Sequence, residues 1–124
     1  MDTWTAAKIE GLPLSEIFDK LPLHLQFFVR AAIKDLAVTK IILFGSHAQG
    51  KASPDSDIDL LIVMHVSDSK RKKTIEIYRL LAGMGIPKDV VLVTPEEFEK
   101  YKNVVGTIIW PAFHEGKLLY ERVA

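Results

Sequence analysis

The sequence predicts an α/β fold, in which a small mixed sheet of three to four strands is flanked by helices. Short apolar runs rich in Val, Ile and Leu, typical of buried strands, alternate along the chain with longer segments of helical periodicity. Glycine, proline and polar residues separate these runs, as expected where strands pass into loops. The 124 residues have the length of a single domain, which we expect to span residues 1–124.

The first part of the chain is predicted to precede the sheet. Residues 1–13, which include Gly11 and Pro13, are predicted to form a loosely ordered lead-in. Two helices are predicted over residues 14–36, the first capped by Ser15 and the second starting at Pro22, since proline is tolerated at the first helical position. The second helix has one apolar face, formed at three- and four-residue spacing by Leu25, Phe28, Val29, Ala32, Ile33 and Leu36.

The strands are predicted from short apolar runs. Residues 40–44, 58–64 and 89–93 are rich in apolar and β-branched side chains, which is typical of strands buried on both faces. Residues 117–120 are predicted to add a short strand near the C-terminus. Residues 40–93 therefore contain the core of the predicted sheet.

Three helices are predicted around these strands. Ser67 or Asp68 is expected to cap a helix that reaches about residue 84. Thr94 is expected to cap the next helix, which opens with a proline and two acids, all favoured in a first turn. A last helical stretch is predicted to end at Gly116.

Composition excludes several classes of protein. The absence of cysteine removes disulfides, thiolate metal sites and cysteine nucleophiles. The sixteen basic and sixteen acidic side chains cancel, which argues against a sequence-independent nucleic-acid coat and makes nucleic acid an improbable direct ligand. No apolar run is long enough to span a membrane, and the first residues do not resemble a signal peptide. We therefore expect a cytoplasmic protein with no membrane partner.

Two acids mark the start of the second predicted strand. Side chains alternate along a strand, so Asp57 and Asp59 should point to one face while Ile58 points to the other. Two carboxylates this close repel each other unless a cation lies between them. Oxygen ligands of this kind suit Mg²⁺, or Mn²⁺ in its place, because such ions bind one or two carboxylates and keep positions for phosphate oxygens.

Gly45 and Ser46 follow the first predicted strand and are expected to open a short helix. Free backbone N–H groups at such a point favour an anion, glycine allows a phosphate to approach the backbone, and the serine hydroxyl adds a donor. Lys51 could add a positive charge nearby. A phosphate cradle beside a metal clamp predicts a site for a nucleoside triphosphate such as ATP.

Asp89 supplies a third acid at the start of the third predicted strand. If this strand neighbours the strand that follows Asp57, the three acids should converge. A third carboxylate there could bind the metal as well, or act as a base toward an acceptor hydroxyl.

The spaced combination resembles a known signature. Gly45-Ser46, ten intervening residues and then Asp57-Ile58-Asp59 resemble the motif of the DNA polymerase beta-like nucleotidyltransferase superfamily. Within it, the short chain most resembles the minimal nucleotidyltransferases, the MNT family. The similarity covers residues 40–93, which the resemblance makes the catalytic core, and the glycine-then-strand ending of residues 114–121.

The resemblance implies a nucleotidyltransferase fold and a Mg²⁺-dependent activity. A nucleoside monophosphate, AMP from ATP, would move to an acceptor hydroxyl. Gly45 and Ser46 would hold phosphates, and the three aspartates would form the catalytic and metal site. MNT proteins are often paired with a HEPN-domain toxin, which they adenylylate as its antitoxin, so the resemblance implies a HEPN partner protein.

One residue departs from the family pattern and keeps two alternatives open. Many members have arginine where this chain has Gln49, and glutamine cannot neutralise a phosphate charge. A catalytically weak or inactive module of the same fold could therefore neutralise its partner by contact alone. A nucleotidyltransferase that modifies a small molecule is the other alternative, disfavoured because the chain has no length for a second domain.

Overall fold

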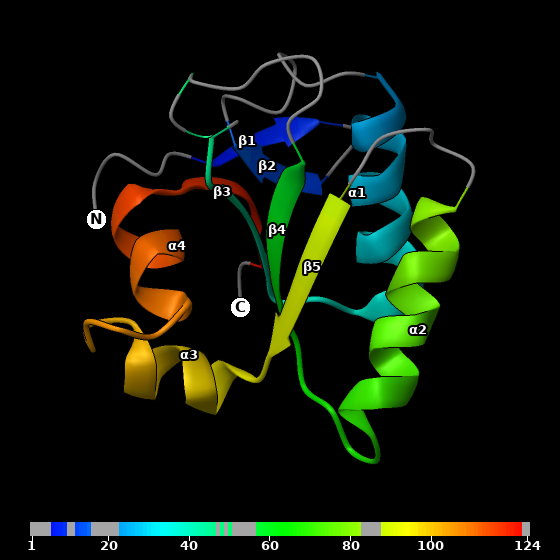
Figure 1. The fold of residues 1–124 in the computed structure, drawn as a ribbon. Helices are drawn as coiled ribbons and strands as arrows, with labels where there is room; N and C mark the ends of the chain where they lie inside the picture. The colour runs from blue at the N-terminus through cyan, green and yellow to red at the C-terminus, as the bar shows by residue number, and fades with distance from the viewer. Residues whose placement is uncertain are drawn as a thin grey trace.

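The computed structural model describes residues 6–9, 12–15, 23–46, 48, 50, 57–82 and 88–122. Its centre is a six-stranded sheet with the order β1-β2-β6-β3-β4-β5. The strands are β1 (Ala6–Ile9), β2 (Leu12–Ser15), β3 (Lys40–Phe44), β4 (Ile58–Val63), β5 (Lys88–Val93) and β6 (Lys117–Glu121) (Figure 1).

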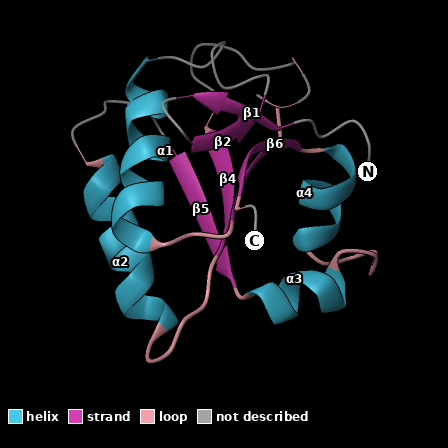
Figure 2. Ribbon diagram, turned by 180° about the vertical axis from the view of Figure 1, so that it is seen from behind, coloured by secondary structure: helices cyan, strands magenta, loops and turns pink. Residues whose placement is uncertain are grey.

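Helices cover both faces of this sheet. They are α1 (Leu23–Leu36), α2 (Lys70–Leu81), α3 (Pro95–Tyr101) and α4 (Ile109–Glu115). The pair α1 and α2 lies on one side of the strands, and the pair α3 and α4 lies on the other (Figures 1 and 2). No helix in the described part of the chain has the length and apolar character needed to cross a membrane.

The sheet is mixed because one neighbouring pair is parallel. β4 and β5 run parallel and are connected through α2, whereas the other neighbouring strands pair antiparallel. The register between β3 and β6 shifts between Ile41 and Ile42, where Leu119 becomes an extra residue on β6. Such a bulge bends one strand without ending the pairing.

Alternation along the strands divides the core into two layers. Leu60 and Ile62 of β4 pack in the cluster that includes α1 and α2, whereas Leu61 and Val63 pack in the cluster that includes α3 and α4. All four side chains are almost completely buried. This explains the continuous apolar run in β4, since both of its faces are covered.

The four predicted strands are confirmed, and the mixed α/β class is confirmed with them. The predicted lead-in over residues 1–13 and the start of a helix at residue 14 are wrong for the described residues. β1 and β2 form an antiparallel pair there, in which Ala6 lies opposite Ser15 and Ile9 lies opposite Leu12. Leu14 of β2 pairs in turn with Tyr120 of β6. The physical reason is that this hairpin supplies partners for backbone groups that β6 would otherwise leave unpaired at its edge. The rest of the helix predicted over residues 14–21 lies outside the described residues.

The predicted helix around residues 22–36 is confirmed as α1, whereas the cap of α2 is corrected. The carboxylate of Asp68 accepts a hydrogen bond from the N–H of Ser69 at 2.7 Å. The hydroxyl of Ser69 then accepts from the N–H of Lys72 at 3.3 Å, so Ser69 rather than Ser67 or Asp68 is the N-cap. The helix ends at Leu81, before the predicted residue 84.

A carboxylate of α3 fastens the start of that helix and links it to α2. Glu97 and Thr94 form a capping box, in which the N–H of Thr94 donates to Glu97 at 2.9 Å and the N–H of Glu97 donates to the Thr94 hydroxyl at 3.1 Å. The ammonium of Lys70 also lies 2.6 Å from one carboxylate oxygen and 2.7 Å from the other. The hydrogen bond from Lys70, followed by that from Thr94, lowers the pKa of Glu97 below its ordinary value of 4.5.

This lowered pKa predicts a defined loss of stability in acid. Because the folded-state pKa of Glu97 is depressed, its contribution is present above about pH 4.5 and is lost as the pH falls through the folded-state pKa. Glu97→Gln keeps an amide able to cap the helix but removes the charge. We expect the urea midpoint of the wild type to fall more steeply below about pH 4.5 than that of the variant. Glu115→Gln, an exposed acid of α4, serves as the control, and equal pH profiles for wild type and Glu97→Gln would contradict the assignment.

Candidate functional site

The predicted site residues meet at one end of the sheet. β3 is antiparallel to β4, so the end of β3 lies beside the start of β4, and the parallel β5 starts at the same end. Phe44 is the register partner of Asp59, which is in turn the register partner of Asp89. Register partners place their side chains on one face, and Phe44 identifies that face as the one covered by α3 and α4.

Gly45 lies directly against the carboxylate of Asp59. A Cβ atom built on Gly45 would collide with Oδ2 of Asp59 and would stand 3.2 Å from its Cγ. The φ of Gly45 is +76°, in the left-handed region that side chains rarely adopt. Glycine is therefore required at this position both by its backbone conformation and by the carboxylate beside it.

A turn follows Gly45 where the sequence predicted a short helix. The N–H of Ala48 donates to the carbonyl oxygen of Gly45 at 3.1 Å, and Ala48 is buried in the core. Residues 45, 46, 48 and 50 form bends and turns, so the predicted helix is not present in the described part of this segment. The turn itself reverses the chain at the end of β3, and the half-buried Ser46 stands at its start. Lys51 and Gln49 lie outside the described residues.

The three acids differ in their surroundings. Asp59 is half-buried, whereas Asp57 and Asp89 are exposed. Asp57 directly precedes β4, two positions from Asp59, and therefore extends the same face. Within the described residues, no three acidic or histidine side chains form a group that could hold a metal. The backbone register thus brings Asp59 and Asp89 side by side, while the predicted convergence of all three carboxylates stays a prediction.

The donor set at this end suits a hard divalent cation. Neither Asp57 nor Asp89 has a basic ion-pair partner within the described part of the chain. Two carboxylates from neighbouring strands are the oxygen ligands that Mg²⁺ accepts while it keeps other positions for phosphate and water. The missing side chain of Gly45 lets the backbone of this residue lie directly against the Asp59 carboxylate. The residues present therefore fit Mg²⁺ or Mn²⁺.

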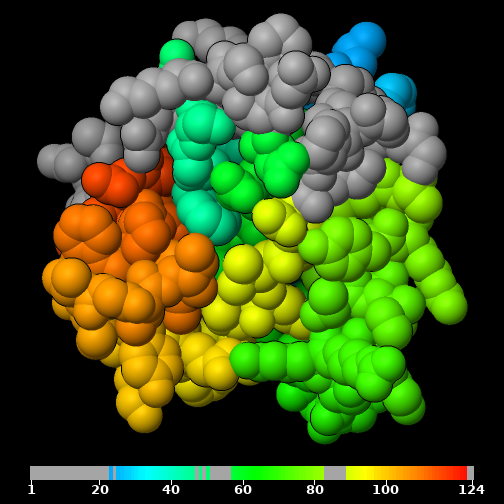
Figure 3. Space-filling model, viewed as in Figure 1, coloured from blue at the N-terminus to red at the C-terminus, as the bar shows by residue number. Residues whose placement is uncertain are grey.

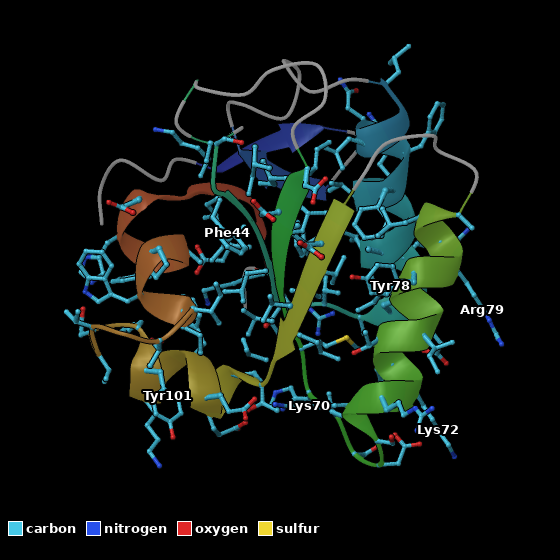
Figure 4. All side chains as sticks on the ribbon, viewed as in Figure 1. Phe44, Lys70, Lys72, Tyr78, Arg79 and Tyr101 are labelled. Atoms are coloured by element: carbon cyan, nitrogen blue, oxygen red, sulfur yellow. The ribbon has the colours of Figure 1, made fainter. Side chains whose placement is uncertain are left out.

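Sequence reasoning missed a tyrosine that supports this end of the sheet. In the described part of the chain β5 is an edge strand that pairs with β4. The hydroxyl of Tyr78 accepts a hydrogen bond from the N–H of Val90 at 3.1 Å, on the residue that follows Asp89. Tyr78 reaches toward β5 from α2 (Figure 4). Helical periodicity could have indicated which side of α2 faces the sheet, but no pattern in the sequence marks this contact.

Comparison with known proteins places this mixed sheet, with its glycine turn and its carboxylates at one end, in a known family. A family model described as "Nucleotidyltransferase domain" matches residues 28–111. The chain therefore belongs to the nucleotidyltransferase domain family, and the sequence-based prediction of this family is confirmed.

Three known proteins illustrate the similarity. The chain is 36% identical over 89 residues to a "putative protein adenylyltransferase" of Methanocaldococcus jannaschii, covering 67% of this chain and 79% of that protein. A crystal structure of a mutant of the toxin–antitoxin MntA-HpeT superposes with a TM-score of 0.53 at 16% identity, covering 76% of this chain and 70% of that one. A putative nucleotidyltransferase from Sulfolobus solfataricus gives a TM-score of 0.52 at 17% identity, covering 80% and 84%. Both solved structures share the fold.

The contact of Tyr78 with β5 predicts a measurable contribution to stability. Tyr78→Phe removes the acceptor for the N–H of Val90 while keeping the ring, so we expect a loss of about 0.5–1.5 kcal/mol in the free energy of unfolding. Chemical denaturation measures it. Tyr101→Phe is the matched control, because it removes a tyrosine hydroxyl from a half-buried ring of α3. Equal stability of the two variants would show that the Tyr78 hydroxyl does not hold β5.

Proposed function

We propose that this protein transfers a nucleoside monophosphate, AMP from ATP, to a hydroxyl group of a protein partner. The observation that carries the proposal is the placement of Gly45 against the carboxylate of Asp59, with Asp89 in register on the next strand. A glycine beside a carboxylate pair allows a polyphosphate and a cation to occupy one small region of backbone. Membership of the nucleotidyltransferase domain family supports the reaction class.

The chain's own residues divide the work at this site. Asp57 and Asp59 would hold Mg²⁺, which when bound would supply neutralisation of triphosphate charge and polarisation of the reacting oxygens, and Asp89 would complete the site. Gly45 gives phosphate oxygens access to the backbone, and the Ser46 hydroxyl donates a hydrogen bond to them. Lys51 is proposed to add a cation to this phosphate site.

The reaction forms one bond and breaks one. The acceptor oxygen attacks the α-phosphorus of ATP, and the bond to the β-phosphate breaks so that pyrophosphate leaves. The exposed Asp89 carboxylate accepts the proton from the acceptor hydroxyl as the new bond forms. Half-buried Asp59, fixed by Gly45 and by the register of three strands, keeps its position while this occurs.

A protein acceptor is favoured over a small molecule. The relative from Methanocaldococcus jannaschii is named for protein adenylyl transfer, and one protein of the same fold was solved as part of a toxin–antitoxin pair. We propose the corresponding role here, in which the chain is an antitoxin that adenylylates a HEPN-domain partner. The family resemblance of the motif at Gly45–Ser46 and Asp57–Asp59 supports that choice.

One observation favours a second candidate function. Gln49 occupies the position at which related sequences often carry arginine, which removes one charge that would contact triphosphate. The alternative is a protein of this fold that neutralises its partner by binding alone. The two functions differ in whether the partner is covalently modified.

Asp59→Asn tests the proposed transfer. The proposed HEPN-domain partner is incubated with wild type or variant, labelled ATP and Mg²⁺, and the intact mass of the partner is measured. We expect wild type to add one or more adenylyl groups and Asp59→Asn to lose activity by about 100-fold or more, because an amide replaces a charged oxygen ligand. Asp35→Asn, at an exposed acid of α1, should retain activity. Growth of cells that express the partner is measured beside this. If wild type and Asp59→Asn restore growth equally and the partner gains no mass, the transfer is overturned and the contact mechanism remains.

A further inference from the structure

Positive charge is concentrated on α2. The helix carries five of the sixteen basic side chains and one of the sixteen acidic ones. The remainder of the chain then has eleven basic and fifteen acidic side chains. The net charge of zero is therefore the sum of a positively charged helix and a negatively charged remainder. Charge segregation of this kind creates a local field that a protein of balanced composition would otherwise lack.

The cations of α2 differ in whether they form ion pairs within the described fold. Lys70 pairs with Glu97 of α3, and Lys73 lies 3.2 Å from Glu76 one turn along. Within the part of the chain that the structure describes, Arg71, Lys72 and Arg79 form no ion pair. Lys72 and Arg79 extend from α2 away from the sheet (Figure 4).

The position of two of these cations, Arg71 and Lys72, also opposes helix formation. The first turn of α2 contains no acid and carries a run of four cations beginning at Lys70. The N-terminus of a helix carries the positive end of its dipole, so cations there are unfavourable. Arg71 and Lys72 therefore do not stabilise the fold, and binding of a negatively charged partner would explain their presence.

An apolar side chain lies between the unpaired cations. Ile75 and Glu76 each lie three or four residues from Lys72 and from Arg79, so all four share one side of the helix. They line a shallow depression of about 270 Å³. Ile75 is 43% exposed. The opposite side of α2 is anchored in the core by Ile77 and Leu81, so the outer face is presented on a fixed support.

This face is accessible and leads toward the candidate active site. In the space-filling view α2 forms one margin of the molecule, opposite the margin formed by α4 (Figure 3). Arg79 lies near the end of α2 that precedes β5, and its neighbour Tyr78 bonds Val90 beside Asp89. A ligand that extends along α2 from Lys72 past Arg79 therefore approaches the end of the sheet that carries the aspartates.

We propose that the outer face of α2, formed by Arg71, Lys72, Ile75 and Arg79, is a docking surface for an acidic amphipathic segment of a protein partner. Acidic side chains of that segment meet the unpaired cations, and an apolar side chain packs on Ile75. The identity of this partner as the acceptor of the nucleotide rests on the proposed function, whereas the docking itself does not.

A protein segment fits this surface better than a nucleic acid. Ile75 and the acidic Glu76 interrupt the row of cations between Lys72 and Arg79. A phosphate backbone is best bound by an unbroken row of cations, and an exposed isoleucine makes no favourable contact with phosphate. An amphipathic acidic helix has both the charge and the apolar contact that the surface offers.

The test uses a short synthetic peptide with leucine at helical spacing and glutamate elsewhere, titrated into the full chain with amide NMR detection. We expect shifts confined to α2, and about tenfold weaker binding or more for the triple variant Arg71→Gln, Lys72→Gln and Arg79→Gln. That variant should melt at about the same temperature as wild type. Two of its substitutions remove unfavourable cations from the start of the helix, and Arg79→Gln removes a favourable one from the last turn. Ile75→Asn should weaken binding by the same factor at low and at high salt, because it removes an apolar contact and no charge.

The matched control removes three exposed cations elsewhere, by Lys34→Gln, Lys100→Gln and Arg122→Gln. Wild-type affinity of this control supports the proposal, and an equal loss in it overturns specific docking. Tighter binding of a single-stranded RNA than of the peptide to α2, or concentration-dependent self-association through α2, would overturn the proposed partner class. Asp59→Asn should bind the peptide as wild type does, so failure of nucleotide transfer and failure of docking give different results.

Discussion

The architecture of the site depends on one close approach, that of Gly45 to the carboxylate of Asp59. No side chain fits between them, and the positive φ of Gly45 turns the chain away from the sheet at the point where β3 has just paired Phe44 with Asp59. The register that fixes this pair also fixes Asp89 on β5. Burial of β4 on both faces makes a shift of that register costly, because a slip by one residue would exchange every buried side chain between the two core layers.

The outer parts of the fold serve that centre in different ways. On one side, Tyr78 of α2 supplies an acceptor to the exposed edge of β5 next to Asp89. At the far end of the sheet, Glu97 joins its own helix cap to Lys70 and so links α3 with α2. α2 thus takes part in the core, in the support of β5 and in the ion pair with α3, while its outer face carries cations that none of these contacts uses.

Much of this could be predicted from the sequence, for reasons that individual residues make plain. The apolar run from Ile58 to Val63 predicted a doubly covered strand, and Thr94 with Glu97 predicted a capped helix, because both signals are local. The hairpin of β1 and β2 was missed, because its stability comes from pairing with Tyr120, more than a hundred residues away in the chain. The contact between Tyr78 and Val90, twelve residues apart, was missed because no sequence pattern marks a side chain that bonds the edge of a strand. The alignment of Asp59 with Asp89 followed once the two strands were taken as neighbours.

The proposed function requires a divalent cation and ATP to meet at the end of the sheet formed by Gly45, Asp59 and Asp89. Paramagnetic broadening of backbone amide signals by Mn²⁺ in the presence of ATP measures this directly, because the effect falls steeply with distance from the ion. We expect the amides of these three residues to broaden first, and Asp59→Asn to abolish the effect while the rest of the spectrum is kept. Broadening centred on another part of the chain, or none when ATP and Mn²⁺ are both present, would contradict it.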